Sequence, residues 1–258
     1  MDALDRWVRA LEERHLADLR FAEVSRALRA LSSVYVERRS RIAEGGALSG
    51  RGKRAAFALF YGPLHYLLVR EIVQALPGAT GIGARLIDLG CGIGASGAAW
   101  ACACRRPPAV VGIDRHSWAL QEAARTYRDL GLSARLRRAD FATAAFPKER
   151  AAFLAAFTLN ELPAAARDAS LRRLMARAES GDPVLVIEPL AGSITPWWTE
   201  WRRAFEDAGG RADEWRVGPA LPAIVAKLDR AAGLSHRELT GRSLWIWRED
   251  AIVQESEP

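Results

Sequence analysis

The sequence is poor in cysteine and has no long apolar run. Its three cysteines are Cys91 in a glycine-rich stretch and Cys102 and Cys104 in an alanine-rich one, so neither a disulfide framework nor a zinc site is expected. No stretch approaches about 18 uncharged apolar residues, which argues against a membrane-spanning helix. The N-terminal residues lack the basic and apolar regions of a signal peptide. Together these absences predict a protein of the reducing cytoplasm.

Lysine is also scarce. The 258 residues include three lysines against 34 arginines, and the formal net charge is +6. Residues 31–60 hold a surplus of four positive charges, which is most of this excess. Such a segment can steer an anionic partner such as RNA, although a solvated helix face and loop would have the same composition. Its basic residues are Arg38, Arg39, Arg41, Arg51, Lys53 and Arg54, against Glu37 and Glu44.

The first 80 residues are expected to be helical. Apolar residues recur at roughly helical spacing over 3–40, and residues 54–76 form a second helical region that is rich in aromatics. The glycines of 44–52 separate the two regions, and Gly62-Pro63 should kink or split the second. We therefore expect a helical extension over 1–80, a larger domain over 81–250 and a tail over 251–258.

From residue 86 onward, short apolar runs alternate with helical stretches. This alternation predicts an α/β fold in which helices cover both faces of a mostly parallel sheet. Near the C-terminus, residues 237–239 and 244–248 flank Thr240-Gly-Arg-Ser243, which predicts a hairpin that adds an antiparallel strand. The expected parallel strands are Leu86–Leu89, Val110–Ile113, Ala134–Arg137, Ala152–Thr158 and Val184–Glu188, with helices such as Trp118–Leu130 and Ala164–Ala178 between them.

The strongest motif is Leu86-Ile-Asp-Leu-Gly-Cys-Gly-Ile-Gly-Ala-Ser-Gly97, where an apolar strand runs into a glycine-rich turn and then a helix. Ligands of open α/β sheets bind at the carboxyl ends of the strands, and glycine lets the backbone approach them closely. The spacing Gly92-x-Gly94-x-x-Gly97 alone also fits a dinucleotide fingerprint. Asp88 favours another ligand, because its carboxylate can bind the amino group of methionine and would repel a pyrophosphate.

Three further segments follow the next strands. Asp114 ends the second strand and can accept hydrogen bonds from two ribose hydroxyls, as acids do in NAD enzymes. After the third strand, Asp140 can accept from an adenine amino group while Phe141 or Trp118 packs on the ring. The segment Thr158-Leu-Asn-Glu-Leu-Pro163 follows the fourth strand and would face a transferable methyl group.

A single strand-terminal aspartate is often only a turn former. Four such sites in chain order instead predict a pocket for S-adenosylmethionine (SAM). The residues expected to bind this donor are Asp88, Gly90, Cys91, Gly92, Gly94, Asp114, Arg115, Asp140, Phe141, Thr158 and Asn160.

Residues 86–190 resemble the class I SAM-dependent methyltransferase family. The resemblance implies a Rossmann-like sheet of seven strands, mostly parallel with an antiparallel C-terminal strand, and SAM as cofactor. The residues on the family's motif positions are Asp88, Gly90, Gly92, Gly94, Asp114 and Asp140.

More weakly, residues 54–66, 157–163 and 186–190 are similar to the Rsm22-like group. These are bacterial and mitochondrial methyltransferase-like proteins linked to the small ribosomal subunit. This similarity implies rRNA methylation in a bacterial cytoplasm. The later cysteine cluster that commonly binds a metal in that group is absent here, because no cysteine follows Cys104. The sulfonium of SAM is itself a good electrophile, so we expect no metal.

A hydroxyl or amine acceptor would benefit from a general base. The candidate catalytic residues are Glu161 and Asn160, beside the expected methyl position, and Tyr61 and His65 on the aromatic helix, with His116 as a further base. A solvated acid at a helix start is the alternative for Glu161, and a packed core histidine for His65.

The acceptor is left open by the sequence. It is either RNA, on the small ribosomal subunit, or a small molecule that stacks on aromatics such as those of Pro196–Trp201. A SAM-binding assembly factor without catalysis and an NAD-dependent oxidoreductase are the remaining alternatives.

Overall fold

The computed structural model describes residues 2–37, 48–190 and 197–248. Within these residues seven strands form one sheet in the order β3-β2-β1-β4-β5-β7-β6. The five strands β1 to β5 run parallel, and β7 pairs antiparallel with both β5 and β6. The strands are β1 (Arg85–Leu89), β2 (Ala109–Asp114), β3 (Ala134–Arg138), β4 (Ala152–Ala156), β5 (Val184–Glu188), β6 (Arg211–Val217) and β7 (Leu239–Ile246).

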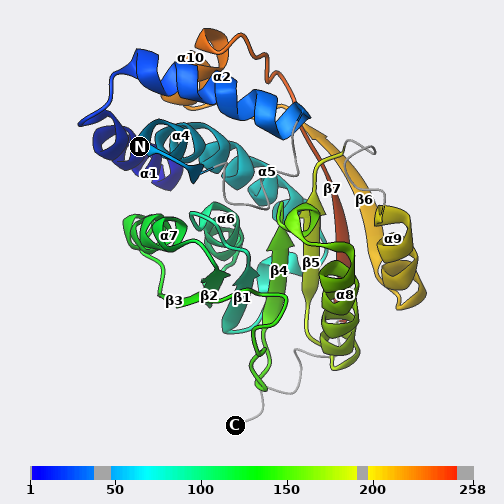
Figure 1. Ribbon diagram of the computed structural model, residues 1–258. Helices are drawn as coiled ribbons and strands as arrows, with labels where there is room; N and C mark the ends of the chain where they lie inside the picture. Colours follow the sequence, from blue (N-terminus) through cyan, green and yellow to red (C-terminus); the bar gives the residue numbers. More distant parts are fainter. Residues whose placement is uncertain (1, 38–47, 191–196, 249–258) are drawn as a thin grey trace.

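Helices cover both faces of this sheet (Figure 1). One face carries α5 (Gly62–Ala75), α6 (Ala95–Ala103) and α7 (Ser117–Asp129), and the other carries α8 (Ala164–Glu179) and α9 (Trp198–Asp207). β4 and β5 are buried at every residue, as expected for strands that are covered on both sides. The sequence-based expectation of an α/β fold with a mostly parallel sheet is therefore confirmed.

The N-terminal helices form a further layer over α5, α6 and α7. This layer contains α1 (Ala3–Leu16), α2 (Phe21–Glu37) and α4 (Arg51–Ala56), and α10 (Ala223–Ala231) joins it from the other end of the chain (Figure 1). Trp7 of α1 is fully buried and donates from Nε1 to Oγ1 of Thr126 on α7 (3.2 Å). The division of the chain at residues 80 and 250 remains a prediction.

The second helical region is split, as Gly62-Pro63 predicted. A single turn of π-helix, η2 (Phe57–Tyr61), lies between α4 and α5, and the Gly62 N–H donates to the carbonyl of Phe57. Proline lacks an N–H and its ring clashes with the preceding turn, so a wider turn before Pro63 relieves the clash. Gly62 packs directly against the Ile93 side chain of the glycine-rich turn, where an added Cβ would overlap it. This contact places the helix at the carboxyl edge of the sheet.

The expected hairpin at the C-terminus is wrong. β7 runs without a break through Thr240-Gly-Arg-Ser243, and its partner is β6, a strand that the sequence did not indicate. The chain does not turn at Gly241. A glycine suits this position because a side chain would crowd the Leu68 side chain of α5. β6 escaped notice because it is an edge strand of exposed and half-buried residues that has neither a clear alternation nor an apolar run.

None of the helices within the described residues is long and apolar enough to cross a membrane.

Candidate functional site

The glycine-rich turn between β1 and α6 is held against the end of β2. The N–H groups of Gly90 and Cys91 both donate to the carbonyl of Ile113, at 2.8 and 3.0 Å. Gly90 has a φ of 68°, and a Cβ there would overlap the side chain of Thr158. Glycine is therefore required at position 90 both for its positive φ and for the close packing of Thr158 against the turn.

Asp88, in β1, holds the glycine-rich turn in place through hydrogen bonds. Its Oδ2 atom accepts from the Gly97 N–H (3.1 Å) and from the Tyr127 hydroxyl (3.1 Å). The residue is 1% exposed, and burial raises the pKa of its carboxyl to about 7, against the two hydrogen bonds that lower it. Both contacts are made within the protein, so Asp88 fixes the start of α6. A contact between Asp88 and the donor stays a prediction.

Asp114 lies at the end of β2 and links the second strand to the turn. Its Oδ2 atom accepts from the Gly92 N–H (2.9 Å), and its Oδ1 atom accepts from the His116 N–H (2.7 Å). Each carboxylate oxygen has a further lone pair. The carboxylate is therefore held in one orientation and can still accept hydrogen bonds from a diol.

The ends of β1 to β4 enclose a cavity of about 50 Å³. It is far smaller than a typical ligand pocket of roughly 300–1,000 Å³, so a nucleoside enters only if the lining residues part. Arg115 and Glu161 form an ion pair across it, with 3.8 Å between Nη2 and Oε2. The lining residues are Gly90, Asp114, Arg115, Ala139, Asp140, Phe141, Thr158, Glu161 and Leu162.

Glu161 is one of three acids that line this cavity, with Asp114 and Asp140. Burial raises the pKa of its carboxyl to about 7, Arg115 lowers it and Asp114 raises it. The side chain keeps 37% exposure, so it remains within reach of solvent and of a bound molecule. At neutral pH this group can both accept and release a proton.

The predicted catalytic residue Asn160 is engaged inside the protein. It donates from Nδ2 to Oε2 of Glu188 (2.5 Å), and its Oδ1 accepts from Nε1 of Trp197 (3.2 Å). Glu188 also accepts from the Leu159 N–H (2.8 Å), and burial raises the pKa of its carboxyl to about 8. Asn160 thus holds the β4 end to the β5 end rather than facing the cavity.

Tyr61 and His65 are brought together in an aromatic cluster next to the cavity. His65 stacks on Phe157 with 4.0 Å between ring centroids, and Phe57 and Tyr61 lie within 6.3 Å of its ring. Burial lowers the pKa of His65 to about 4, so its imidazole is neutral at physiological pH. Phe157 has a φ of 57°, a left-handed conformation that turns its side chain toward α5. Neither Tyr61 nor His65 lines the cavity.

The two aromatics proposed for adenine are both covered. The Phe141 ring packs in the core beneath α8 and the residue is 6% exposed. Trp118 is half-buried, and the guanidinium of Arg54 lies 5.5 Å from its ring centroid. Asp140 is exposed and accepts from the Ala142 N–H (2.9 Å). Phe141 and Asp140 both line the cavity, and the carboxylate of Asp140 is the more exposed of the two.

Residues 86–181 match the sequence profile of a family described as a methyltransferase domain. The matched segment contains the strands β1 to β4 and the glycine-rich turn at the end of β1. Residues 86–181 form a SAM-dependent methyltransferase domain of class I. The resemblance inferred from the motifs, the fold and the expected cofactor are thereby confirmed.

Solved structures with this fold include two methyltransferases that align over most of the chain. Mitomycin 7-O-methyltransferase MmcR aligns over 93% of this chain and 72% of its own, with 15% identity and a TM-score of 0.55. An O-methyltransferase family protein from Burkholderia thailandensis aligns over 76% of this chain, with 14% identity and a TM-score of 0.52. The chain spans only 60% of the length of that protein. No curated protein matches the sequence significantly.

Two cysteines of the methyltransferase domain are buried. Cys91, in the turn itself, is 6% exposed, and its sulfur lies against Gly112 of β2. Burial raises the pKa of the Cys91 thiol well above its usual value, and the carboxylates of Asp88 and Asp114 raise it further. Among the described residues, no group of three or more His, Cys, Asp or Glu side chains is placed to hold a metal ion.

Several residues that shape the site were not indicated by the sequence. Tyr127 supports Asp88 from the middle of α7, where nothing distinguishes it from a core aromatic. Glu188 did carry a signal, because it is an acid at the end of a buried strand. Ala139 and Leu162 line the cavity but have ordinary apolar side chains.

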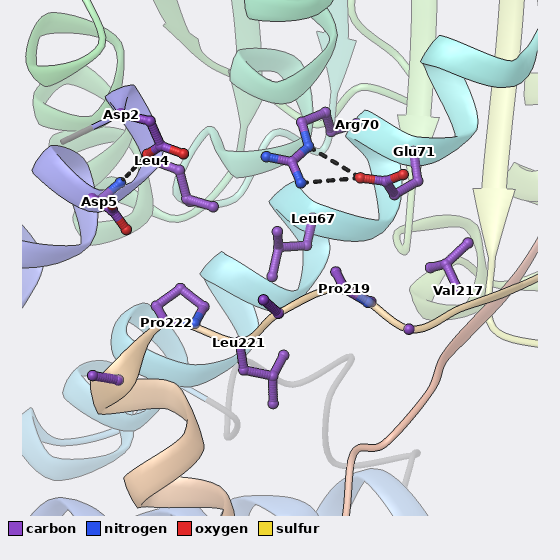
Figure 2. A pocket seen from close by; sticks show the side chains of 13 residues that line it. Asp2, Leu4, Asp5, Leu67, Arg70, Glu71, Val217, Pro219, Leu221 and Pro222 are labelled. Atoms are coloured by element: carbon purple, nitrogen blue, oxygen red, sulfur yellow. Dashed lines mark hydrogen bonds and ion pairs between the residues drawn. The ribbon is translucent and has the colours of Figure 1, made fainter.

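A second cavity, of about 490 Å³, lies between α1, α5 and the segment that follows β6 (Figure 2). Arg70 donates to Glu71 at 3.0 and 3.3 Å, and Asp2 accepts from the Asp5 N–H (2.7 Å). None of the residues predicted for the site lines this cavity.

Proposed function

We propose that this methyltransferase transfers a methyl group from SAM to an oxygen or nitrogen atom of a small molecule, with Glu161 as general base. The observation that carries the proposal is the position of Glu161. It lines the cavity at the end of β4, and the pKa of its carboxyl is about 7. A base is most effective when its pKa lies near the working pH.

The residues around the turn fit the donor. Gly90 and Thr158 line the cavity where a methionine moiety would lie, and Asp114 offers two oriented oxygens to a ribose diol. Asp140 is exposed where an adenine amino group would lie. When bound, SAM supplies an electrophilic methyl carbon, so the chain has to align the acceptor and remove its proton.

Glu161 removes that proton in this scheme. Its carboxylate accepts the proton of an acceptor hydroxyl as the oxygen attacks the methyl carbon, or the proton of an ammonium group before the freed nitrogen lone pair attacks, and SAH leaves as the methyl–sulfur bond breaks. Arg115, 3.8 Å away, favours the ionised form before the acceptor arrives. Tyr61, His65 and Asn160 then have supporting roles, because their polar groups lie off the cavity or are bound within the protein.

A small-molecule acceptor is favoured over RNA by the surroundings of the basic segment. Arg51 pairs with Asp18 (2.6 Å), and Arg54 donates to the carbonyl of Leu48 (2.9 Å). Arg38, Arg39 and Arg41 lie outside the described residues. The aromatic cluster around His65 suits a compact apolar acceptor, and the name of MmcR denotes methyl transfer to a small molecule.

The test combines binding with transfer. Calorimetric titration with S-adenosylhomocysteine (SAH) measures the donor site, and labelled SAM with a panel of phenols, amines and ribosomal RNA measures transfer. Glu161→Gln should bind SAH as the wild type does but lower kcat by about 10²- to 10⁴-fold. The wild-type rate should rise with pH to a plateau above about 7, because only the ionised carboxylate is a base, and the variant should lose this dependence.

Glu206→Gln is the matched control, because Glu206 is an exposed acid paired with Arg202 on α9. Transfer to RNA alone would overturn the acceptor class. SAH binding without transfer to any acceptor would favour the assembly-factor alternative. An unchanged rate in Glu161→Gln would show that Glu161 is not the general base.

A further inference from the structure

Tyr127, in α7, is a buried tyrosine whose hydroxyl is turned to Asp88. The residue is 1% exposed, and its hydroxyl donates to Oδ2 of Asp88 in β1 (3.1 Å). A buried hydroxyl is costly unless it is hydrogen-bonded, and a phenylalanine ring would fill a purely apolar space equally well. The hydroxyl therefore indicates a role at the Asp88 carboxylate in addition to core packing.

Two glycines of the turn make room for this tyrosine. A Cβ at Gly94 would lie 3.0 Å from two carbons of the Tyr127 ring, and a Cβ at Gly97 would lie 2.9 Å from its hydroxyl oxygen. Gly92 differs, because nothing lies within 4 Å of the place of its Cβ. The spaces beside Gly94 and Gly97 are thus filled from within the protein, and of these three glycines only Gly92 has an open side.

Asp88 is a buried acid without a nearby cation. Its Oδ2 atom accepts from Tyr127 and from the Gly97 N–H, so both lone pairs of this oxygen are used. The ionisable groups that act on the carboxyl are Tyr127, Asp114 and Cys91, and in the described part of the chain none of these can carry a positive charge. Such a carboxylate is left to attract a cation from outside the protein.

The charge of Asp88 acts close to the expected donor. Gly90 and Asp114 line the cavity at the ends of β1 to β4, and Gly90 follows Asp88 by two residues. Burial raises the pKa of the Asp88 carboxyl to about 7, and the hydrogen bonds from Tyr127 and Gly97 lower it. Without the Tyr127 hydroxyl the carboxyl would keep its proton to a higher pH.

We propose that Tyr127 is a positioning residue of the donor site, which orients the Asp88 carboxylate and favours its ionised form, so that the cationic donor is attracted to the turn. The proposal rests on the function proposed above. SAM carries an ammonium and a sulfonium group, and SAH keeps the ammonium group. Tyr127 touches neither of them and acts through Asp88 alone.

The test measures SAH affinity against pH by calorimetry, in the full chain carrying Glu161→Gln, which removes the carboxyl of the cavity that also titrates near 7. The Kd for SAH should fall as pH rises and level off above about 7, because ionised Asp88 attracts the ammonium group. Adding Tyr127→Phe should weaken binding about 3- to 10-fold at neutral pH and move the levelling to higher pH, because the hydrogen bond that lowers the pKa of Asp88 is lost. With Glu161 intact, Tyr127→Phe should raise the KM for SAM much more than it lowers kcat.

Tyr66→Phe is the matched control, because Tyr66 is a buried tyrosine of α5 whose hydroxyl contacts Cys102 instead of the turn. It should leave the Kd for SAH and its pH dependence unchanged. Asp88→Asn should leave only the pH dependence that belongs to the ligand's own amino group. Gly97→Ala is a second route, because alanine favours a helix while its methyl group displaces Asp88 and Tyr127. It should weaken SAH binding as Tyr127→Phe does, and it decides the matter if that variant does not fold.

An equal loss of affinity at every pH in Tyr127→Phe would show a merely structural hydroxyl and would overturn the proposal. An unchanged Kd in folded Tyr127→Phe, or the same loss in Tyr66→Phe, would overturn it too. Absence of SAH binding when Tyr127 is intact would instead count against the proposed function.

Discussion

The carboxyl edge of the sheet has two halves that are built differently. The donor half, at the ends of β1, β2 and β3, is held by backbone groups and the carboxylates that bind them, all within residues 86–141. The half where we propose that the acceptor binds, called the acceptor half, lies at the ends of β4 and β5 and the start of β7, and side chains from distant parts of the chain hold it. His65 meets Phe157 there, and Arg242 meets Trp198.

The difference indicates how freely the residues of each half can be substituted. A donor that never changes can be held by a backbone turn, which tolerates few substitutions. An acceptor that differs between enzymes of one fold is better recognised by side chains on separate elements, because each can change without disturbing the others. The contrast can be tested by substitutions on either side.

The largest effect is expected where the two halves touch, at Gly90. Gly90→Ala should lower the free energy of unfolding by about 2–5 kcal/mol, because the new Cβ meets Thr158 and the φ of 68° disfavours a side chain. Gly131→Ala is the control, since Gly131 has a φ of 71° but nothing within 4 Å of the added carbon. Urea denaturation should give a loss of only about 1–2 kcal/mol for the control. Equal losses would show that crowding at Thr158 is unimportant.

Asp88→Asn should change the pH dependence of stability. The folded state holds the Asp88 proton up to a pKa of about 7, whereas the unfolded chain loses it near the ordinary value of about 4. The wild type therefore loses stability as pH rises from about 4 to 7, and the loss persists above 7. Asparagine can still accept from Gly97 and Tyr127, so the variant should gain about 2–4 kcal/mol over the wild type at pH 8 and almost nothing at pH 4. A variant that is less stable at pH 8 would contradict this.

Asp114→Ala should weaken SAH binding by about 1.5–3 kcal/mol, or roughly 10- to 100-fold, because two charge-assisted hydrogen bonds to the ribose are lost. Asp114→Asn keeps one acceptor oxygen, so its affinity for SAH should lie between those of Asp114→Ala and the wild type. Calorimetry at fixed salt measures both. Unchanged affinity in a folded Asp114→Ala protein would remove this residue from the donor site.

The smallest effect is expected at Arg51, outside both halves. Its ion pair with Asp18 joins side chains that are 68% and 72% exposed, so Arg51→Ala should cost less than about 1 kcal/mol. Transfer to a small acceptor should be unchanged. A tenfold fall in kcat/KM would show that the basic segment takes part in binding the acceptor.

The donor half could be predicted from sequence because its geometry follows from short-range rules. A buried strand, a glycine-rich turn and an acid at the next strand end specify positions within a few residues of one another. Asp114 and Gly90 accordingly lie where the motif predicted. The edge strand β6 gave no such signal, because one side of it faces solvent and its residues Arg211-Ala-Asp-Glu-Trp-Arg-Val217 do not alternate clearly.

The acceptor half could not be predicted in the same way. The partners of Asn160 are Glu188 and Trp197, 28 and 37 residues away, and nothing local to Asn160 indicates either of them. Gly241 was interpreted as a turn because the helix that requires its missing side chain lies far away in the sequence. Such contacts are set by packing between elements, which a local pattern does not contain.

Cys91 shows how the donor half avoids damage from its own substrate. SAM is an alkylating agent, and a thiolate beside its sulfonium would be methylated in competition with the acceptor. Burial and the neighbouring carboxylates of Asp88 and Asp114 keep the Cys91 thiol protonated at physiological pH. The same buried acids that shape the turn therefore keep its sulfur in the weakly nucleophilic thiol form, and we expect SAM bound at this turn to leave Cys91 unmethylated.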